Sequence, residues 1–225
     1  MRLIRAARPF GGSVLGAARS AFVACCAVFV IPACSHDSTA ANPNPTPQAT
    51  GIDALIVSVE DVRRIADYDE LTTHGRETMR NPPPGDLNAP GPCRAAGTSD
   101  VTFAGGWNEF RSAGYSGVSD DIDPGGSALV GSVSQAVAIY PDERTARSAL
   151  DRLLSSLQAC VDLHDPHYDF KVDKSDATTV RITDQGWSHF YRAKNAVLIS
   201  VGVVGIEPAE RIASDVLQVV TDRVK

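Results

Sequence analysis

Hydrophobic residues are distributed along the 225-residue chain in three different ways. The first 33 residues end in a nearly continuous apolar run, Ala21 to Ile31, which follows four arginines and no acidic residue. The next stretch, Ser35 to Gly51, is rich in Ser, Thr, Asn, Pro and Ala and has no apolar pattern to bury. A regular pattern begins near Leu55 and continues to the C-terminus, so we expect one folded domain over residues 52–225.

Three segments of this domain have the apolar spacing of helices. Ser58 and Asp61 form a capping-box-like start for a short helix that ends near Asp67. Pro208 begins a C-terminal helix whose apolar face contains Ile212, Ala213, Val216, Val219 and Val220. The clearest helix runs from Asp142 to Leu163 and carries a continuous stripe on one face. The stripe consists of Ala146, Ala149, Leu150, Leu153, Leu154, Leu157 and Cys160.

Strand-like segments occupy much of the remainder. Trp107 to Val118 and Ala128 to Tyr140 are expected to pair as an antiparallel hairpin, because the turn-rich "SDDIDPGGS" connects them. The last of the later strands is apolar enough for a central position in the sheet. These later strands are predicted over Thr178–Thr183, Ser188–Arg192 and Val197–Val204.

The stretch from Arg80 to Cys93 contains five prolines, which remove backbone donors, so it is predicted to be a long ordered loop. The resulting order is helix, two strands, helix, about three strands and helix. This order predicts an α+β fold with a mainly antiparallel sheet flanked by helices.

The N-terminal segment has the features of a lipoprotein signal peptide. Its apolar run of about 11 residues has the length of a signal-peptide core and is too short to span a bilayer. The run leads to Ile31-Pro32-Ala33-Cys34, which resembles the bacterial lipobox, whose cysteine is acylated and becomes the N-terminus. We therefore predict a signal peptide over residues 1–33, lipidation of Cys34 and a disordered tether over residues 34–51. The alternative is an ordinary secreted protein in which Cys34 is incidental.

Removal of the signal peptide changes both the charge and the cysteine content. The formal net charge of the whole chain is −6, and the mature chain retains 17 basic and 27 acidic residues, or about −10. Such a protein is a poor candidate for binding nucleic acid or anionic lipid through charge. Cys25 and Cys26 leave with the signal peptide, whereas Cys93 and Cys160 remain and most simply form one disulfide in an exported protein. Two separately buried thiols are the alternative.

Five features follow one another in a characteristic order. They are the lipobox with its tether, "PGPC" ahead of a strand pair, "AVAIYPDERTARSALDRLLSSLQAC", "KNAVLISVGVVG" and "AERIASDVLQVVTDRV". Together they resemble the PknH-like extracellular sensor domain family, which occurs on a mycobacterial serine/threonine kinase and in stand-alone lipoproteins. The resemblance implies an antiparallel sheet flanked by helices, a groove for a ligand and a disulfide between Cys93 and Cys160. A second family disulfide, whose later cysteine falls near Trp187, is missing from this sequence.

No catalytic or metal-binding motif is evident in the sequence. His164-Asp165-Pro166-His167 matches no familiar zinc spacing, so we expect a solvated loop there. Neither "GYSGVS" nor "GGSALVG" has the spacing of a nucleophile elbow, and no phosphate loop or dinucleotide fingerprint is present. We predict no cofactor, no metal and no enzymatic activity. A hydrolase that uses His164, His167 or His189 as a base is the less favoured alternative.

Aromatic side chains are the candidates for ligand contacts. Trp187, His189 and Tyr191 alternate and should share one face of a strand, and Trp107 and Tyr115 lie on another predicted strand. Such residues suit an apolar or sugar-like ligand, although a place in the core is the simpler interpretation of each one. We therefore expect a non-catalytic sensor module, anchored by lipid on the extracytoplasmic face of the cell membrane. An envelope scaffold that binds a protein partner is the alternative.

Overall fold

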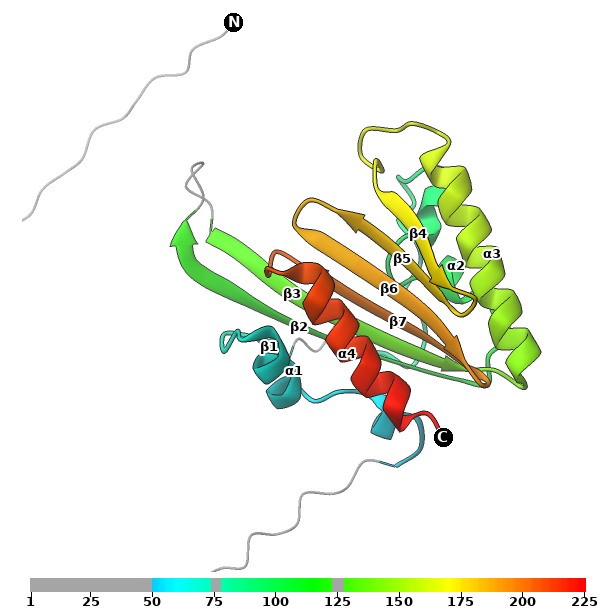
Figure 1. Cartoon of the computed structure of the whole chain (residues 1–225), viewed down its shortest axis with the longest axis horizontal. Coiled ribbons are helices and arrows are strands. Elements are labelled where there is room, and N and C mark those ends of the chain that lie inside the picture. The colour runs from blue at the N-terminus through cyan, green and yellow to red at the C-terminus, as the bar shows by residue number, and fades with distance from the viewer. Residues whose placement is uncertain (1–49, 74–77, 123–127) are drawn as a thin grey trace, which may run out of the picture. The chain divides into compact units, whose positions relative to one another are not determined.

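A seven-stranded antiparallel sheet forms the middle layer of the domain (Figure 1). The computed structural model describes residues 50–73, 78–122 and 128–225, so the predicted signal peptide, Cys34 and nearly all of the tether lie outside the described residues. The strand order is β1-β2-β3-β7-β6-β5-β4, which places β7 in the centre, as its apolar sequence predicted. The strands are β1 Thr72–Thr73, β2 Glu109–Ile122, β3 Ala128–Ile139, β4 Lys171–Asp176, β5 Thr179–Asp184, β6 Trp187–Lys194 and β7 Val197–Val204.

Helices cover both faces of this sheet and complete the α+β fold that the sequence predicted. Helices α1 (Val59–Ala66) and α4 (Ala209–Arg223) lie on one face, and α2 (Asp100–Phe103) and α3 (Glu143–Val161) lie on the other. The domain also has two short 3₁₀ helices. Helix η1 (Gly51–Leu55) lies on the same face as α1 and α4, and η3 (Gly91–Ala95) lies on the same face as α2 and α3. Within the described part of the chain, no helix combines the length and apolar character needed to cross a membrane.

Alternating residues of the central strands divide the interior into two cores. On β7, Val197, Ile199, Val201 and Val203 face the α1/α4 core, whereas Leu198 faces the α3 core. The predicted stripe of α3 is buried in that second core except for Leu154, which is only partly buried. Because both faces of β7 are covered, its unbroken apolar sequence follows from its position.

Capping side chains fix the starts of two of the three predicted helices, α1 and α3. The Oγ of Ser58 accepts a hydrogen bond from the backbone N–H of Asp61, as the capping-box-like start of α1 predicted. Asp142 caps α3 in the same way, with Oδ1 2.8 Å from the N of Thr145. Each cap satisfies a backbone donor that the first helical turn leaves unpaired.

Strand β4 is the main element that the sequence did not predict. Its residues, Lys171–Asp176, are almost all exposed at the sheet edge, so they lack the alternation that marks a half-buried strand. The predicted strand at Trp107 was also wrong at its start, because β2 begins at Glu109 and Trp107 precedes it. Strand β2 extends into the predicted connection as far as Ile122, whereas β3 begins at Ala128 as predicted. Residues 123–127 lie outside the described chain.

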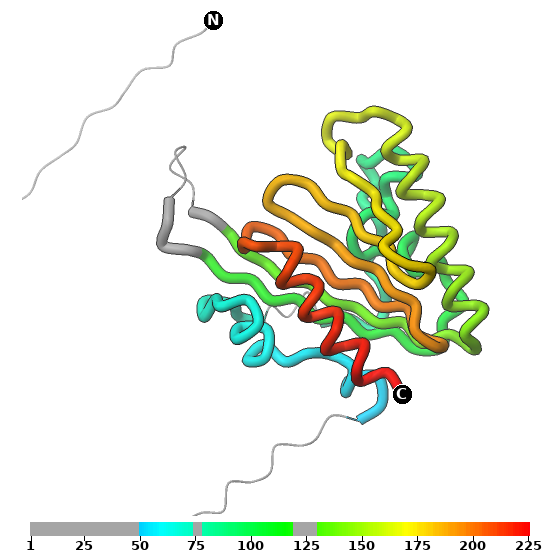
Figure 2. The backbone as a smooth tube through the Cα atoms, in the orientation of Figure 1, coloured from blue at the N-terminus to red at the C-terminus, as the bar shows by residue number. Residues whose placement is uncertain are grey.

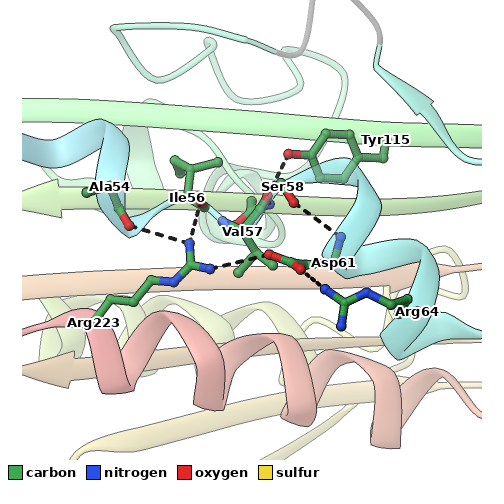
Figure 3. A network of polar contacts seen from close by, with 9 residues as sticks. Ala54, Ile56, Val57, Ser58, Asp61, Arg64, Tyr115 and Arg223 are labelled. Carbon is green, nitrogen blue, oxygen red and sulfur yellow. Dashed lines mark hydrogen bonds and ion pairs between the residues drawn. The ribbon is translucent and has the colours of Figure 1, made fainter. Parts of the chain in front are cut away.

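The start and the end of the described chain are joined by one arginine. Arg223 of α4 donates through Nη1 to the carbonyl oxygens of Ile56 (2.6 Å) and Ala54 (3.4 Å). Its Nη2 lies 3.6 Å from Oδ2 of Asp61, which also pairs with Arg64 (Figure 3). The first described residues therefore lie beside the C-terminus (Figure 2).

Candidate ligand groove on the sheet face

The five aromatic candidates do not form one cluster. Trp187, His189 and Tyr191 share the α3 face of β6, as their alternation predicted. Trp107 packs against the same core from the loop before β2, with its ring centroid 5.9 Å from that of Phe110. Tyr115 points to the opposite face, into the α1/α4 core.

Two of these side chains have clear structural roles. The Tyr115 hydroxyl donates to the carbonyl oxygen of Val57 at 2.7 Å, and burial raises the pKa of Tyr115 to about 12. The Tyr191 hydroxyl donates to the carbonyl of Gly97 at 3.1 Å and accepts from its N–H at 2.8 Å. Tyr115 thus holds the segment before α1, and Tyr191 holds the segment before α2.

His189 belongs to a buried polar chain that the sequence did not reveal. Its Nε2 lies 2.7 Å from the Oγ of Ser200, which lies 3.0 Å from the Oγ1 of Thr98. The imidazole also stacks on Tyr191, with ring centroids 4.6 Å apart. Burial lowers the pKa of His189 to about 3, so the ring is neutral at physiological pH.

This pair meets the distance requirement for a nucleophile and its base, but not the other requirements. Ser200 has 0% exposure, and its hydroxyl already contacts Thr98. General-base catalysis also needs a base with a pKa near the working pH, which His189 does not have. We therefore interpret the His189–Ser200 contact as a packing contact that orients the imidazole.

A small groove lies next to this polar chain on the α3 side of the sheet. Its volume is about 160 Å³, close to that of an engineered apolar cavity that binds benzene. Met79, Pro83 and Thr98 form one wall, whereas β2 and β3 form the floor. The floor residues are Ser112, Ala113, Gly114, Ser134 and Gln135.

The wall of the groove is held to the sheet at several points. The backbone N–H of Ser112 donates to the carbonyl of Met79 at 3.0 Å, and the N–H of Met79 donates to the Oγ of Ser112 at 3.2 Å. The Cys93–Cys160 disulfide links η3, within the same connecting segment, to α3. These links give the groove a fixed wall before any ligand arrives.

Apolar side chains are exposed farther along the same face, beyond the Ser116–Ser132 pair. Val118 pairs with Val130, and Val204 pairs with both Ser132 and Trp187. The three valines are 56%, 56% and 51% exposed, which is unusual for large apolar residues in the middle of a sheet. We call Val118, Val130, Val204 and Trp187 the valine strip.

Neither the groove nor the valine strip could be predicted directly from the sequence. Serine and glycine positions such as Ser112, Gly114 and Ser134 resemble solvent-facing positions until the strands are paired. Once they are paired, small residues lie side by side and leave a hollow between the sheet and the segment from Met79 to Thr98.

The histidines of the predicted solvated loop do not form a metal site. His167 is exposed and its Nδ1 lies 3.1 Å from Oδ1 of Asp165, within one turn. Across the residues that the structure describes, no group of three or more His, Cys, Asp or Glu side chains is placed to hold a metal ion.

Comparison with known proteins relates this architecture to one family. The sequence profile of the PknH-like extracellular domain matches residues 47–223. The crystal structure of the extracellular domain of PknH from Mycobacterium tuberculosis has a similar fold, with a TM-score of 0.54 and 17% identity, over 77% of this chain and 94% of that one. No curated protein matches the chain significantly. The chain therefore belongs to the PknH-like extracellular domain family.

Proposed function

We propose that this protein is a lipid-anchored sensor module of the cell envelope that binds the apolar part of a small ligand in the groove. The family places the domain outside the cytoplasm. The observation that carries the proposal is the apolar groove of about 160 Å³, with the exposed valine strip farther along the same face.

The groove has the features of a site for an apolar ring or a short alkyl segment. Its lining is almost entirely apolar, and it includes Met79 and Pro83. The hydroxyls of Thr98 and Ser134 already have partners, in Ser200 and the carbonyl of Gly202. A ligand larger than the groove would continue over Val130 and Val204, where it would cover exposed apolar surface. Burial of that surface would contribute about 25 cal/mol per Å² before the costs of binding are subtracted.

Acylation of Cys34 would supply the anchor. The proposal is supported by Ile31-Pro32-Ala33-Cys34 at the end of the apolar run, and by the tether that follows it. Cys34→Ala is expected to release the protein from membranes, whereas Cys26→Ala, which lies within the apolar run, is the matched control and is expected to leave it attached. Membrane attachment of Cys34→Ala without added lipid mass would contradict the anchor.

Native mass spectrometry of the full protein extracted from its own membrane tests ligand binding. We expect an added mass beyond the Cys34 lipid in the wild type and its loss in Ser134→Phe, because a phenyl ring would fill the groove. Ser155→Phe makes the same change at an exposed position of α3, away from the groove and the valine strip, so it should retain the mass. A clean protein mass in the wild type, or equal retention by both variants, would rule out the groove as the site.

A second candidate function is recognition of an envelope protein. The valine strip favours it, because exposed apolar side chains across neighbouring strands suit a protein partner. Val130→Asp would then abolish recovery of a crosslinked partner that Ser134→Phe still captures. Loss in Ser134→Phe alone would assign the contact to the groove.

A further inference from the structure

An open pocket on the opposite face of the sheet is lined by arginines. Its volume is about 570 Å³, within the usual range of ligand sites. It is bordered by the start of α4 and by the outer strands β4, β5 and β6. We call it the arginine pocket, and its lining residues are Ser175, Thr179, Arg181, Phe190, Arg192, Pro208, Glu210, Arg211 and Ser214.

Two of the arginines project from the middle of strands on the α4 face. Arg181 of β5 is paired across the sheet with Phe190, and Arg192 of β6 is paired with Thr179. The same face carries valine and isoleucine on β7, so the surface changes from apolar to cationic within two strands. The Arg181 guanidinium lies 6.0 Å from the centroid of the buried Phe190 ring, which adds an apolar floor.

The guanidinium groups are not equally neutralised. Arg181 pairs with Glu210 and, at 2.9 Å, with Asp173, whereas Arg211 pairs with Asp215 at 3.2 Å. Arg192 contacts only neutral oxygens, with its Nε 2.9 Å from Oγ1 of Thr179. Among the described residues, no carboxylate forms an ion pair with Arg192.

A buried donor of Arg181 is also unused. Its Nε is buried and has no hydrogen-bond partner among the described residues, although both terminal nitrogens are paired. A buried guanidinium donor without an acceptor is costly, so Arg181 would gain a hydrogen bond if its side chain shifted to offer this donor to a ligand.

We propose that the arginine pocket binds an oxyanion, either a carboxylate or a phosphate monoester, carried on a flat apolar group. Arg192 and the Arg181 guanidinium contact the oxyanion, and Phe190 supports the apolar group. Glu210 occupies part of the anion position through its ion pair with Arg181, so it competes with the ligand.

A purely structural network explains only part of this arrangement. The Arg181–Glu210 pair joins β5 to the first turn of α4, and such a pair would stabilise the packing of that helix. It does not account for the unpaired Nε of Arg181. Arg192 forms no ion pair among the described residues, although Thr179 connects it to the Asp176 carboxylate, which feels its charge. Both features are expected of a site for an anion.

Calorimetric titration of the full chain in neutral detergent tests this site, with phenyl phosphate and benzoate as probes. We expect saturable binding of at least one probe to the wild type, and the tighter probe identifies the preferred oxyanion. Glu210→Gln should bind about fivefold more tightly, because the negative charge that competes for Arg181 is removed. Arg192→Gln should bind about tenfold more weakly through the loss of a charge-assisted hydrogen bond.

Arg152→Gln is the control, because it makes the same charge change on α3, on the other side of the sheet. It should leave the affinity unchanged, as should Ser134→Phe in the groove. Binding by neither the wild type nor Glu210→Gln would overturn the proposal. Equal affinity in Arg192→Gln and the wild type would also overturn it. A misfolded variant would lose affinity, so the tighter binding expected for Glu210→Gln cannot be an effect of misfolding.

Discussion

The imidazole of His189 lies across Gly202, its partner on the neighbouring strand, and reaches Ser200 at 2.7 Å. A Cβ atom added to Gly202 would come within 2.4 Å of the His189 Nδ1. The absence of a side chain at Gly202 therefore leaves room for the imidazole on the sheet. Burial there lowers the pKa of His189 and keeps the ring neutral.

Replacement of this glycine should be costly for the fold. Gly202→Ala is expected to lower the free energy of unfolding by about 1–3 kcal/mol, because the ring must move and its bond to Ser200 is strained. Gly91→Ala is the control, since a Cβ there would meet no atom within 4 Å. Urea unfolding of the two variants measures the difference, and equal stability would contradict the packing described for His189.

The buried histidine also predicts a pH dependence of stability. The unfolded chain takes up a proton at His189 near pH 6.5, whereas the folded protein does so only near pH 3, because burial lowers the pKa. The unfolded state therefore binds more protons between these values, and stability falls as the pH falls. From pH 7 to pH 5 the contribution of His189 is a loss of about 2 kcal/mol.

His189→Gln isolates that contribution, because glutamine keeps a polar group near Ser200 but does not titrate. The variant should be less stable at pH 7 and should lose about 2 kcal/mol less than the wild type between pH 7 and pH 5. Denaturant unfolding across this range gives both curves. Parallel curves would show that His189 does not titrate as the structure indicates.

The disulfide should contribute substantially to stability. It joins Cys93 to Cys160 over a separation of 67 residues and attaches the segment that borders the groove to α3. The Cys93→Ala/Cys160→Ala double variant is expected to lose about 4 kcal/mol in the chain-entropy model. Urea unfolding under oxidising conditions measures this loss, and a reducing agent should affect only the wild type.

Arg223 should hold the first described segment to the C-terminal helix. Arg223→Gln removes donors to Ile56 and Ala54, so we expect a loss of about 1–3 kcal/mol and faster amide exchange around residues 52–58. Arg64→Gln is the matched control, because exposed Arg64 also pairs with Asp61 but contacts no carbonyl of that segment. The control should change stability by less than about 0.5 kcal/mol. Equal exchange rates in the two variants would show that the contact is unimportant.

The elements predicted correctly from the sequence are those whose burial leaves a clear pattern of apolar residues. The α3 stripe and the apolar β7 were located correctly, because packing against a sheet and coverage on both faces leave simple patterns. The polar edge strand β4 leaves no such pattern, since solvent rather than the core contacts most of it. Trp107 was assigned to the strand because an aromatic residue can be buried either in the first strand position or in the loop just before it, and the sequence does not distinguish the two.

Contacts between strands were harder to predict than the strands themselves. The His189–Ser200 contact depends on the register of β6 and β7, which the two-residue connection Asn195-Ala196 fixes. That short connection was the available signal, because a two-residue hairpin loop places Lys194 opposite Val197 and His189 opposite Gly202. The groove is formed jointly by β2, β3 and the segment from Met79 to Thr98, so the sequence of any one of them does not predict it.

The hydrogen bonds from Arg223 to Ala54 and Ile56 affect how the domain would respond to a pulling force on its N-terminal side. A pull on Thr50 reaches Ala54 and Ile56 within a few residues, and their carbonyls are bonded to the last turn of α4. The force would therefore act along a helix packed on the central strands, and would not peel β1 or β4 from the sheet edges. The residue after Ile56, Val57, is hydrogen-bonded to Tyr115 of β2 and to Gln135 of β3, so part of the load would pass directly to the two strands that form the floor of the groove.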